Sequence, residues 1–359
     1  MADSRRKPLV PRELAGSCRR AELLPSPGLS RYCRSLVRFS AILNDIALIY
    51  ARIDLYFEKI QPFLPLFHRP SFHAHVLNSS RYGEDRYQHL DWQASLILSG
   101  MFALAARFSP RNDIFGRDLK ERCEPFAKRS THLWDYARRT NAGDNPDLRY
   151  LQGSILVACH QLTSGPGFRA WLATGVCVRM AYDLSLHIMD RNAAGTSNER
   201  MRSPPDWAKD EEKRRAWWAV FEIDTFASTV ACRPFVTDMN RMDVLLPVSD
   251  EAWFNLTPVM SAPLLSSGPL VAWKSLVDSE NQSAHAWFIV SNYLMRSSHE
   301  ILENREVTEH LLENLLSALQ CFSLCLPRYF RVSGPNMIFD ETNFADMNWI
   351  ISTHFMIQK

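Results

Sequence analysis

The sequence predicts an all-α protein, a multi-helical array of stacked helical hairpins with irregular, proline-rich connections. Apolar residues recur at helical spacing in one segment after another. Only 13 glycines occur in 359 residues, which is about half the usual frequency, and hairpin dipeptides such as Asn-Gly are scarce. Hydrophobic residues make up 46% and charged residues 22%. The chain can therefore bury a sizeable core, and wholesale disorder is excluded.

The first half of the chain predicts helices separated by proline and glycine. A helix over 41–60 ends before Pro62 and Pro65, because proline breaks a helix. Ser71 is expected to cap the next helix. Residues 92–108 are so apolar that both faces of this helix should be buried. Three further helices are expected at 115–139, 147–163 and 167–188. The last of these places one apolar face on Ala173, Val176, Cys177, Met180, Leu184 and Ile188.

The second half predicts one central helix and several later ones. Residues 191–208 form a polar loop that ends in a double proline, and a helix follows over 209–231. Its interior, AWWAVFEIDTFAS, is apolar on most sides, which is typical of a central helix. Its acidic start favours two i, i+4 ion pairs, Asp210–Arg214 and Glu211–Arg215. An irregular stretch is expected over 233–270. Three further helices are expected at 283–303, 306–326 and 341–357.

Residues 1–39 are expected to form a basic, disordered arm ahead of a helical domain over 40–359. Residues 1–38 contain nine Lys/Arg and three Asp/Glu, a balance of +6, so the net charge of +2 leaves −4 for the remainder. Such an arm fits a nuclear import signal or a contact with DNA phosphates, although a solvated tail is an equal alternative. The candidate residues are Arg5, Arg6, Lys7, Arg19 and Arg20. The start has no apolar signal region and no window is apolar enough to span a membrane, so we expect neither secretion nor membrane insertion.

Eight cysteines are scattered along the chain, most of them within apolar stretches, as Cys159 and Cys177 are. This distribution is typical of buried, reduced thiols in an intracellular protein. Cys321 and Cys325 lie four residues apart on a leucine-rich helix, and we expect both to be buried as well.

No catalytic constellation is recognisable in the sequence. The nucleophile-elbow, phosphate-loop, dinucleotide-binding and zinc-protease motifs are absent. An enzyme on this scaffold would have His68, His160, Asp183 and His187 as its plausible acid/base residues. Two of these, Asp183 and His187, lie four residues apart. A contact on the helix surface explains that pair equally well. We therefore predict that the chain is not an enzyme, and we name no catalytic residue.

Histidines cluster in HRPSFHAH, at His68, His73 and His75. Histidines two residues apart can share a metal ion when a carboxylate completes the site. The flanking prolines and aromatic residues favour a packed turn instead. We predict no metal site and no cofactor.

Asp224 is the most informative polar residue. It lies within WWAVFEIDTF, where an unpaired charge would be costly, so it should have a cationic or hydrogen-bonding partner. The candidates are Arg214, Arg215 and Arg233. Structural pairing is favoured over catalysis.

Three segments together resemble the fungal-specific transcription factor domain, the middle homology region of fungal zinc-cluster transcription regulators. YFEKIQPFLPLFHRPSF (56–72) is similar to its entry motif, and FRAWLATGVCVRMAYDLSLH (168–187) to its next signature. EEKRRAWWAVFEIDTFASTVACRPFVTDMNRMDVLLP (211–247) resembles its most diagnostic one. The likeness extends over roughly 45–250. The residues that match the motifs, which we expect to be architectural, are Arg69, Arg214, Arg215, Trp217, Trp218, Asp224, Arg233, Pro234, Asp243 and Pro247.

The chain departs from the family pattern in several places. Cys232 stands where the family often has glycine, and Thr225 where arginine is common. Members usually begin with six cysteines that hold two zinc ions, whereas only Cys18 and Cys33 precede residue 123 here. Because each zinc ion needs four ligands, we expect the zinc-cluster DNA-binding module to be lacking, and zinc would be expected only with it. The chain stops within an apolar helix, so we also expect the domain to be incomplete at its C-terminus.

The resemblance implies a nuclear regulator of RNA polymerase II transcription, for example of a metabolic or biosynthetic gene cluster. Its partners would be other transcription regulators or a second copy, with a small-molecule effector and only weak or indirect DNA contact. Two alternatives stay open: an enzyme on a reused helical scaffold, and a module that dimerises with full-length relatives. A pocket that gathers His and Asp side chains would favour the enzyme.

Overall fold

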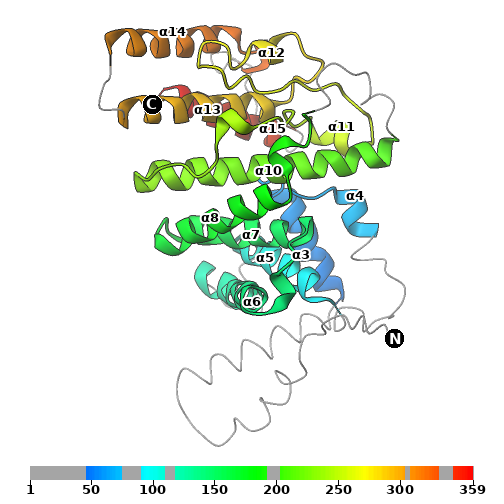
Figure 1. Ribbon diagram of the computed structural model, residues 1–359. Helices are drawn as coiled ribbons and strands as arrows, with labels where there is room; N and C mark the ends of the chain where they lie inside the picture. The colour runs from blue at the N-terminus through cyan, green and yellow to red at the C-terminus, as the bar shows by residue number, and fades with distance from the viewer. Residues whose placement is uncertain are drawn as a thin grey trace, which may run out of the picture. The chain divides into compact units, whose positions relative to one another are not determined.

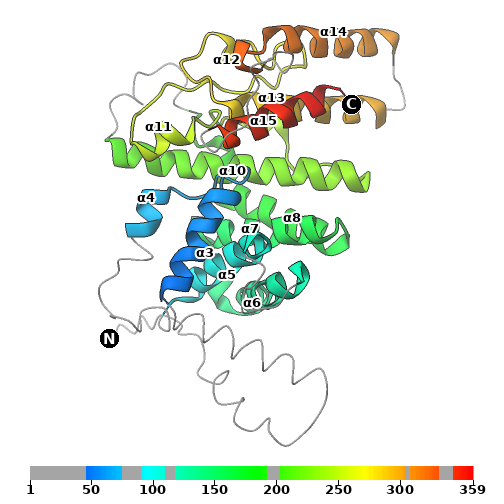
Figure 2. The same ribbon diagram turned by 180° about the vertical axis from the view of Figure 1, so that it is seen from behind.

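The computed structural model describes residues 46–74, 90–109, 118–191, 203–303, 308–330 and 343–358. Within these ranges the regular elements are α- and 3₁₀-helices, together with π-helical residues at 73–74 and an isolated bridge between Leu245 and Pro263 (Figures 1 and 2). The prediction of an all-α protein is confirmed. The basic arm, with its five candidate residues, lies outside the described residues, as do Cys18, Cys33 and His75.

The chain divides into two compact units that interleave in sequence. The first draws its described residues from Met1–Ile60 and Ser71–His160, and the second from Gln61–Pro70 and Gln161–Lys359. The helices of the first unit are α3 (Ile46–Lys59), α5 (Trp92–Ala105), η5 (Ala106–Phe108), α6 (Leu119–Arg139), η6 (Asn141–Gly143) and most of α7 (Leu148–Ser164). The short helix α4 (Arg69–Phe72) contains the point, between Pro70 and Ser71, at which the chain passes from the second unit to the first.

Helix α5 forms the core of the first unit. Every residue of α5 except Gln93 is buried, which confirms that both of its faces are covered. Its close approach to α7 depends on glycine: a Cβ added at Gly100 would lie 2.7 Å from Leu156, and one at Gly153 would lie 2.7 Å from Leu96. The two helices pack this closely because neither glycine carries a side chain.

The second unit is built around the long helix α10 (Pro204–Ala231). Its other elements are α8 (Phe168–Asp183), η7 (Leu186–Ile188), η8 (Met239–Arg241), α11 (Asp250–Phe254), α12 (Lys274–Val277), α13 (Ala284–Glu303), α14 (Glu309–Cys325), η9 (Arg328–Phe330) and α15 (Phe344–Ile357). Within this unit α10 lies between α8 and α13, α15 runs beside α13, and α14 forms the outer layer (Figures 1 and 2).

Helix α10 begins five residues earlier than predicted. The double proline, expected to belong to the loop, occupies the first two helical positions, where a missing N–H costs nothing. Ser203 caps this end, because its side chain accepts a hydrogen bond from the Asp206 amide. The boundary expected at residue 209 was therefore wrong.

Two further boundary predictions were also wrong. Helix α8 ends at Asp183 rather than 188, because Ser185 adopts a left-handed conformation with φ 56°. Ser71 does not cap a helix, since it lies inside α4, which begins at Arg69.

Cys321 and Cys325 are exposed, so the prediction of buried thiols was wrong for this pair. Helix α14 buries the stripe formed by Leu315, Ala318 and Phe322, and both cysteines fall beside that stripe. Cys177 is buried as expected, and so is Cys123, whereas Cys159 is only partly buried. No described helix combines the length and apolar content that crossing a membrane would require.

Candidate functional site

Two motif residues of α10, Arg215 and Trp218, bind a segment that follows the helix in sequence, residues 243–250. Trp217 and Trp218 are completely buried. Trp218 Nε1 donates a 2.8 Å hydrogen bond to the carbonyl of Leu245. This bond joins the most apolar part of α10 to this segment, of which residues 243–249 lie outside the helices and Asp250 begins α11.

Arg214 forms a buried bidentate ion pair with Asp190. Its Nε and Nη2 donate to the two carboxylate oxygens at 2.8 and 2.7 Å. The same carboxylate accepts the Leu245 amide at 3.0 Å. The predicted pair of Arg214 with Asp210 was wrong, because Asp210 instead binds Lys213 on the helix surface, at 3.0 Å.

Arg215 lies at the centre of a second cluster. It binds Glu211 at 3.0 Å, as predicted, and also the carboxylate of Asp250. Its Nη2 donates to the Val248 carbonyl at 2.7 Å, while Glu211 accepts the Val248 amide at 3.0 Å. The guanidinium lies 4.1 Å from the ring centroid of Trp253. The backbone of Val248 is thus held on both sides by one ion pair of α10.

Asp224 is buried and is satisfied mainly by the loop after α10. Its carboxylate accepts the amides of Val236 and Thr237 at 3.0 and 2.9 Å and the Thr237 hydroxyl at 2.8 Å. A partner was correctly expected, but none of the three predicted arginines forms an ion pair with it within the ranges that the structure covers. Arg296 of α13 supports the arrangement indirectly, by donating to the hydroxyl and carbonyl of Thr237.

The remaining motif residues lie at turns. Arg233 stacks 4.7 Å above the ring of Trp171, and the carbonyl of Pro234 accepts the Ser228 hydroxyl at 3.3 Å. Asp243 pairs with Arg191 at 2.9 Å. The last two are Pro247, whose buried carbonyl accepts two side-chain hydrogen bonds, and Arg69, which is exposed at the start of α4.

Sequence reasoning missed four polar residues that complete these clusters: Asp190, Asp250, Asn281 and Arg296. Arg296 alone carried a signal, because it interrupts an apolar helix. Asp190 and Asn281 come from loops, where a polar side chain is ordinary, and Asp250 is the first residue of the short helix α11, where an acidic residue is also ordinary.

The acid/base residues of the enzyme alternative have separate surroundings. His68 Nε2 lies 3.0 Å from the Trp253 carbonyl, and burial lowers the pKa of its imidazole. His160 belongs to the first unit, where burial and then Arg107 lower its pKa to about 4. Asp183 is exposed, and His187 packs 4.7 Å from the ring of Tyr182. The end of α8 at Asp183 breaks their expected i, i+4 relationship.

The histidine cluster is likewise divided between contacts. His73 lies 3.9 Å from Asp54 and packs beside Phe57, whereas His68 belongs to the other unit. Among the described residues, no three His, Cys, Asp or Glu side chains are grouped as a metal site would require.

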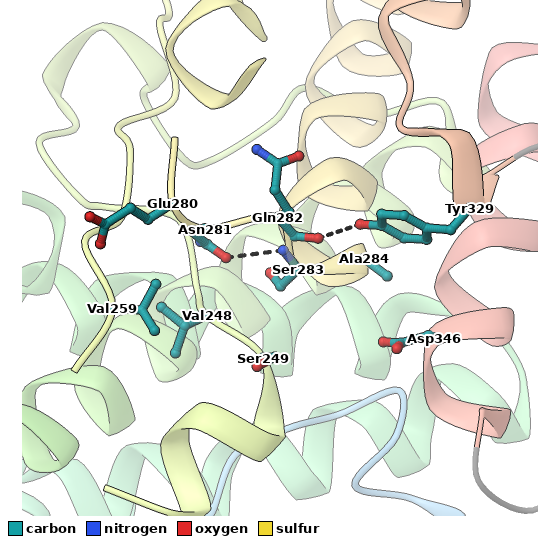
Figure 3. A pocket seen from close by; sticks show the side chains of 10 residues that line it. All are labelled: Val248, Ser249, Val259, Glu280, Asn281, Gln282, Ser283, Ala284, Tyr329 and Asp346. Carbon is teal, nitrogen blue, oxygen red and sulfur yellow. Dashed lines mark hydrogen bonds between the residues drawn. The ribbon is translucent and has the colours of Figure 1, made fainter. Parts of the chain in front are cut away.

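A pocket of about 250 Å³ opens at the N-terminal end of α13 (Figure 3). Its apolar lining comes from Val248, Val259 and Ala284. The polar lining residues are Ser249, Glu280, Asn281, Gln282, Ser283, Tyr329 and Asp346. None of the four acid/base candidates lines this pocket, so it does not gather the His and Asp side chains that would favour the enzyme.

These features define a helical domain in which the polar motif residues of α10 form a buried framework. The model of the fungal specific transcription factor domain family matches residues 53–319. The chain belongs to this family.

Curated relatives are fungal transcription factors. The tropolone cluster transcription factor tropK of Talaromyces stipitatus is 26% identical over 64% of this chain and 38% of its own length. The ascochitine biosynthesis cluster transcriptional regulator of Didymella fabae is 24% identical over 82% of this chain and 49% of its own. The chain thus spans less than half the length of each. No solved structure shows significant similarity to it.

Proposed function

We propose that this protein regulates RNA polymerase II transcription in the nucleus and that its targets include the genes of a biosynthetic cluster. The observation that carries the proposal is the family match over 53–319, which contains the α10 framework. The cluster-specific names of its relatives support the choice of target genes. We propose no catalytic role for α10, because its buried polar groups are used in holding residues 236–237 and 243–250 in place.

The helical body would not itself recognise a specific DNA sequence. Sequence is read by side chains placed against base edges, and the basic arm supplies cations suited to phosphates. Binding of the arm to DNA would be weak, indifferent to sequence and steeply dependent on salt, with a log–log slope of about −0.9 per phosphate neutralised. Promoter selectivity would then come from a partner that carries a DNA-binding domain, or from a longer form of this protein.

A mobility-shift competition tests whether the chain by itself prefers a particular DNA sequence. The 359-residue chain should bind a candidate promoter from a biosynthetic cluster no more tightly than scrambled DNA of equal length, and deletion of 1–38 should abolish binding. A preference for the promoter of about a thousandfold, which is typical of specific recognition, would contradict it.

We also propose that the chain holds no stoichiometric zinc. Elemental analysis of the purified protein should find well under one zinc ion per chain. Two zinc ions per chain would reveal a site on residues outside the described ranges.

The proposal as a whole is tested by deleting the gene and measuring transcripts of biosynthetic-cluster genes in the same organism. We expect a severalfold change that is reversed when the gene is restored. A matched strain carrying Arg214→Met should behave like the deletion, because the α10 framework would be broken. Unchanged transcripts after deletion would reject the proposed function.

A further inference from the structure

We propose that the pocket at the N-terminal end of α13 binds a small organic cation through Asp346, with the apolar wall of the pocket receiving its carbon skeleton. That such a ligand acts as an effector rests on the proposed function, whereas the binding site itself rests on the geometry below.

The wall of the pocket is fixed before any ligand arrives. The Val248 backbone is held by Glu211 and Arg215 of α10. From the other side, Asn281 Nδ2 and Ser283 Oγ donate to the Pro247 carbonyl at 2.9 and 2.6 Å. A site whose walls are held by buried hydrogen bonds loses little free energy in becoming ordered around a ligand.

The charged side chains of the pocket have one sign. Its charged lining residues are Glu280 and Asp346, and none of the described lining residues is lysine or arginine. Figure 3 shows the two carboxylates on opposite sides of the first turn of α13. Burial raises the pKa of Asp346, and the negative charges of Asp250 and Glu251 raise it further. A bound cation would relieve both effects, because it favours the ionised carboxylate.

The remaining surface suits a carbon skeleton. Val259 is partly exposed and offers an apolar contact, whereas Val248 and Ala284 line the pocket with only 2% of each residue exposed. The Tyr329 hydroxyl donates to the Gln282 carbonyl, which fixes the ring at the rim (Figure 3). The volume of about 250 Å³ lies below the roughly 300–1,000 Å³ of sites for drug-sized ligands. The ligand should therefore be compact.

A metal ion fits this pocket less well than an amine. Calcium takes six to eight oxygen ligands and zinc takes four. The described residues offer no cluster of three carboxylate, thiol or imidazole groups here. A single ammonium group needs only one carboxylate and neighbouring hydrogen-bond acceptors.

The test is calorimetric titration of the 359-residue chain at pH 7.5 with three carbon skeletons: n-butyl, cyclohexyl and 2-phenylethyl. Each skeleton is supplied as the amine, the alcohol and the carboxylate. We expect at least one amine to bind at least tenfold more tightly than its alcohol and its carboxylate. Asp346→Asn should weaken that binding at least tenfold. Asp278→Asn, which changes an exposed carboxylate outside the pocket, should leave it unchanged.

Three results would overturn the proposal. They are the absence of any amine preference across the skeletons, equal amine binding by Asp346→Asn, and displacement of the amine by micromolar Ca²⁺, which would assign the site to a metal. Each is independent of transcription. Intact amine binding with unchanged transcripts after gene deletion would reject only the proposed function. Changed transcripts without amine binding would reject only the proposed pocket.

Discussion

The guanidinium of Arg214 binds the carboxylate of Asp190 through two hydrogen bonds of 2.8 and 2.7 Å, with 2% and 5% of the two side chains exposed. Asp190 follows η7, and its carboxylate also accepts the Leu245 amide. One buried ion pair therefore connects three segments of the second unit that are distant in sequence.

Removing one member of this pair should be strongly destabilising. Arg214→Met leaves the Asp190 carboxylate buried without its cation, and such changes typically cost about 3–5 kcal/mol. Asp190→Leu combined with Arg214→Met should cost less than the two single changes added together. Chemical denaturation with a double-mutant cycle measures both. A cost below about 1 kcal/mol for Arg214→Met would contradict the assignment.

The two tryptophans of α10 offer a matched comparison. Both are fully buried, but Trp218 Nε1 donates to Leu245 whereas Trp217 Nε1 has no hydrogen-bond partner among the described residues. Trp218→Phe should cost about 1–3 kcal/mol more than Trp217→Phe, because it also leaves a buried carbonyl unsatisfied. Thermal unfolding of the two variants side by side checks this. Equal losses would show that the indole hydrogen bond adds nothing.

The helices were predictable where the apolar pattern alone decides the structure. Residues 92–108 could be recognised as a buried helix because almost every side chain is apolar. The partner of Arg214 could not, because Asp190 lies 24 residues away and only the folded loop brings it close. The arginines proposed for Asp224 were wrong for a related reason: backbone amides of 236–237 satisfy the carboxylate, and amides leave no trace in the sequence.

Replacing Cys232 with glycine, the residue that the family often has at this position, should stabilise the protein. It follows α10 with φ 49° and ψ 53°, a left-handed conformation that costs a non-glycine residue roughly 1–2 kcal/mol. Glycine relieves this cost but adds freedom to the unfolded chain. Cys232→Gly should therefore raise the free energy of unfolding by about 0.5–1 kcal/mol.

The control for this change is Cys232→Ala, which removes the thiol and keeps the strained backbone. Urea denaturation should show no gain for alanine. A gain of equal size in both variants would assign the effect to the thiol instead of the conformation.

The first unit should lose stability in acid through His160. Its folded pKa of about 4 lies below the usual 6.5, because the imidazole is buried and faces Arg107. As the pH falls from 6.5 to 4 the unfolded chain takes up this proton and the folded chain does not, so stability decreases over that window. The contribution is at most about 1 kcal/mol per pH unit, since the side chain is partly exposed.

His160→Gln should reduce the pH dependence of the free energy of unfolding between pH 6.5 and 4.5. His132→Gln, which changes an exposed histidine of the same unit, should retain the wild-type dependence. Identical pH profiles for wild type and His160→Gln would show that the imidazole is not shielded in the folded protein.

The pocket could not have been found in the sequence. Its walls come from residues 248–259, the start of α13, Tyr329 and Asp346, segments that carry no shared motif. Asp346 reads as an ordinary acidic residue in the first turn of an apolar helix. It stays partly exposed in the folded protein, and its significance arises only because folding places it at the pocket and near the negative charges of Asp250 and Glu251.

The central claim is that this helical body acts on transcription, and a tethered reporter tests it most directly. The chain is fused to a heterologous DNA-binding domain and compared with that domain alone on a promoter carrying its sites, with both proteins at equal nuclear levels. We predict that the fusion changes reporter transcription severalfold and that Arg214→Met abolishes the change. A folded, nuclear fusion that leaves the reporter at the level of the DNA-binding domain alone would contradict the account.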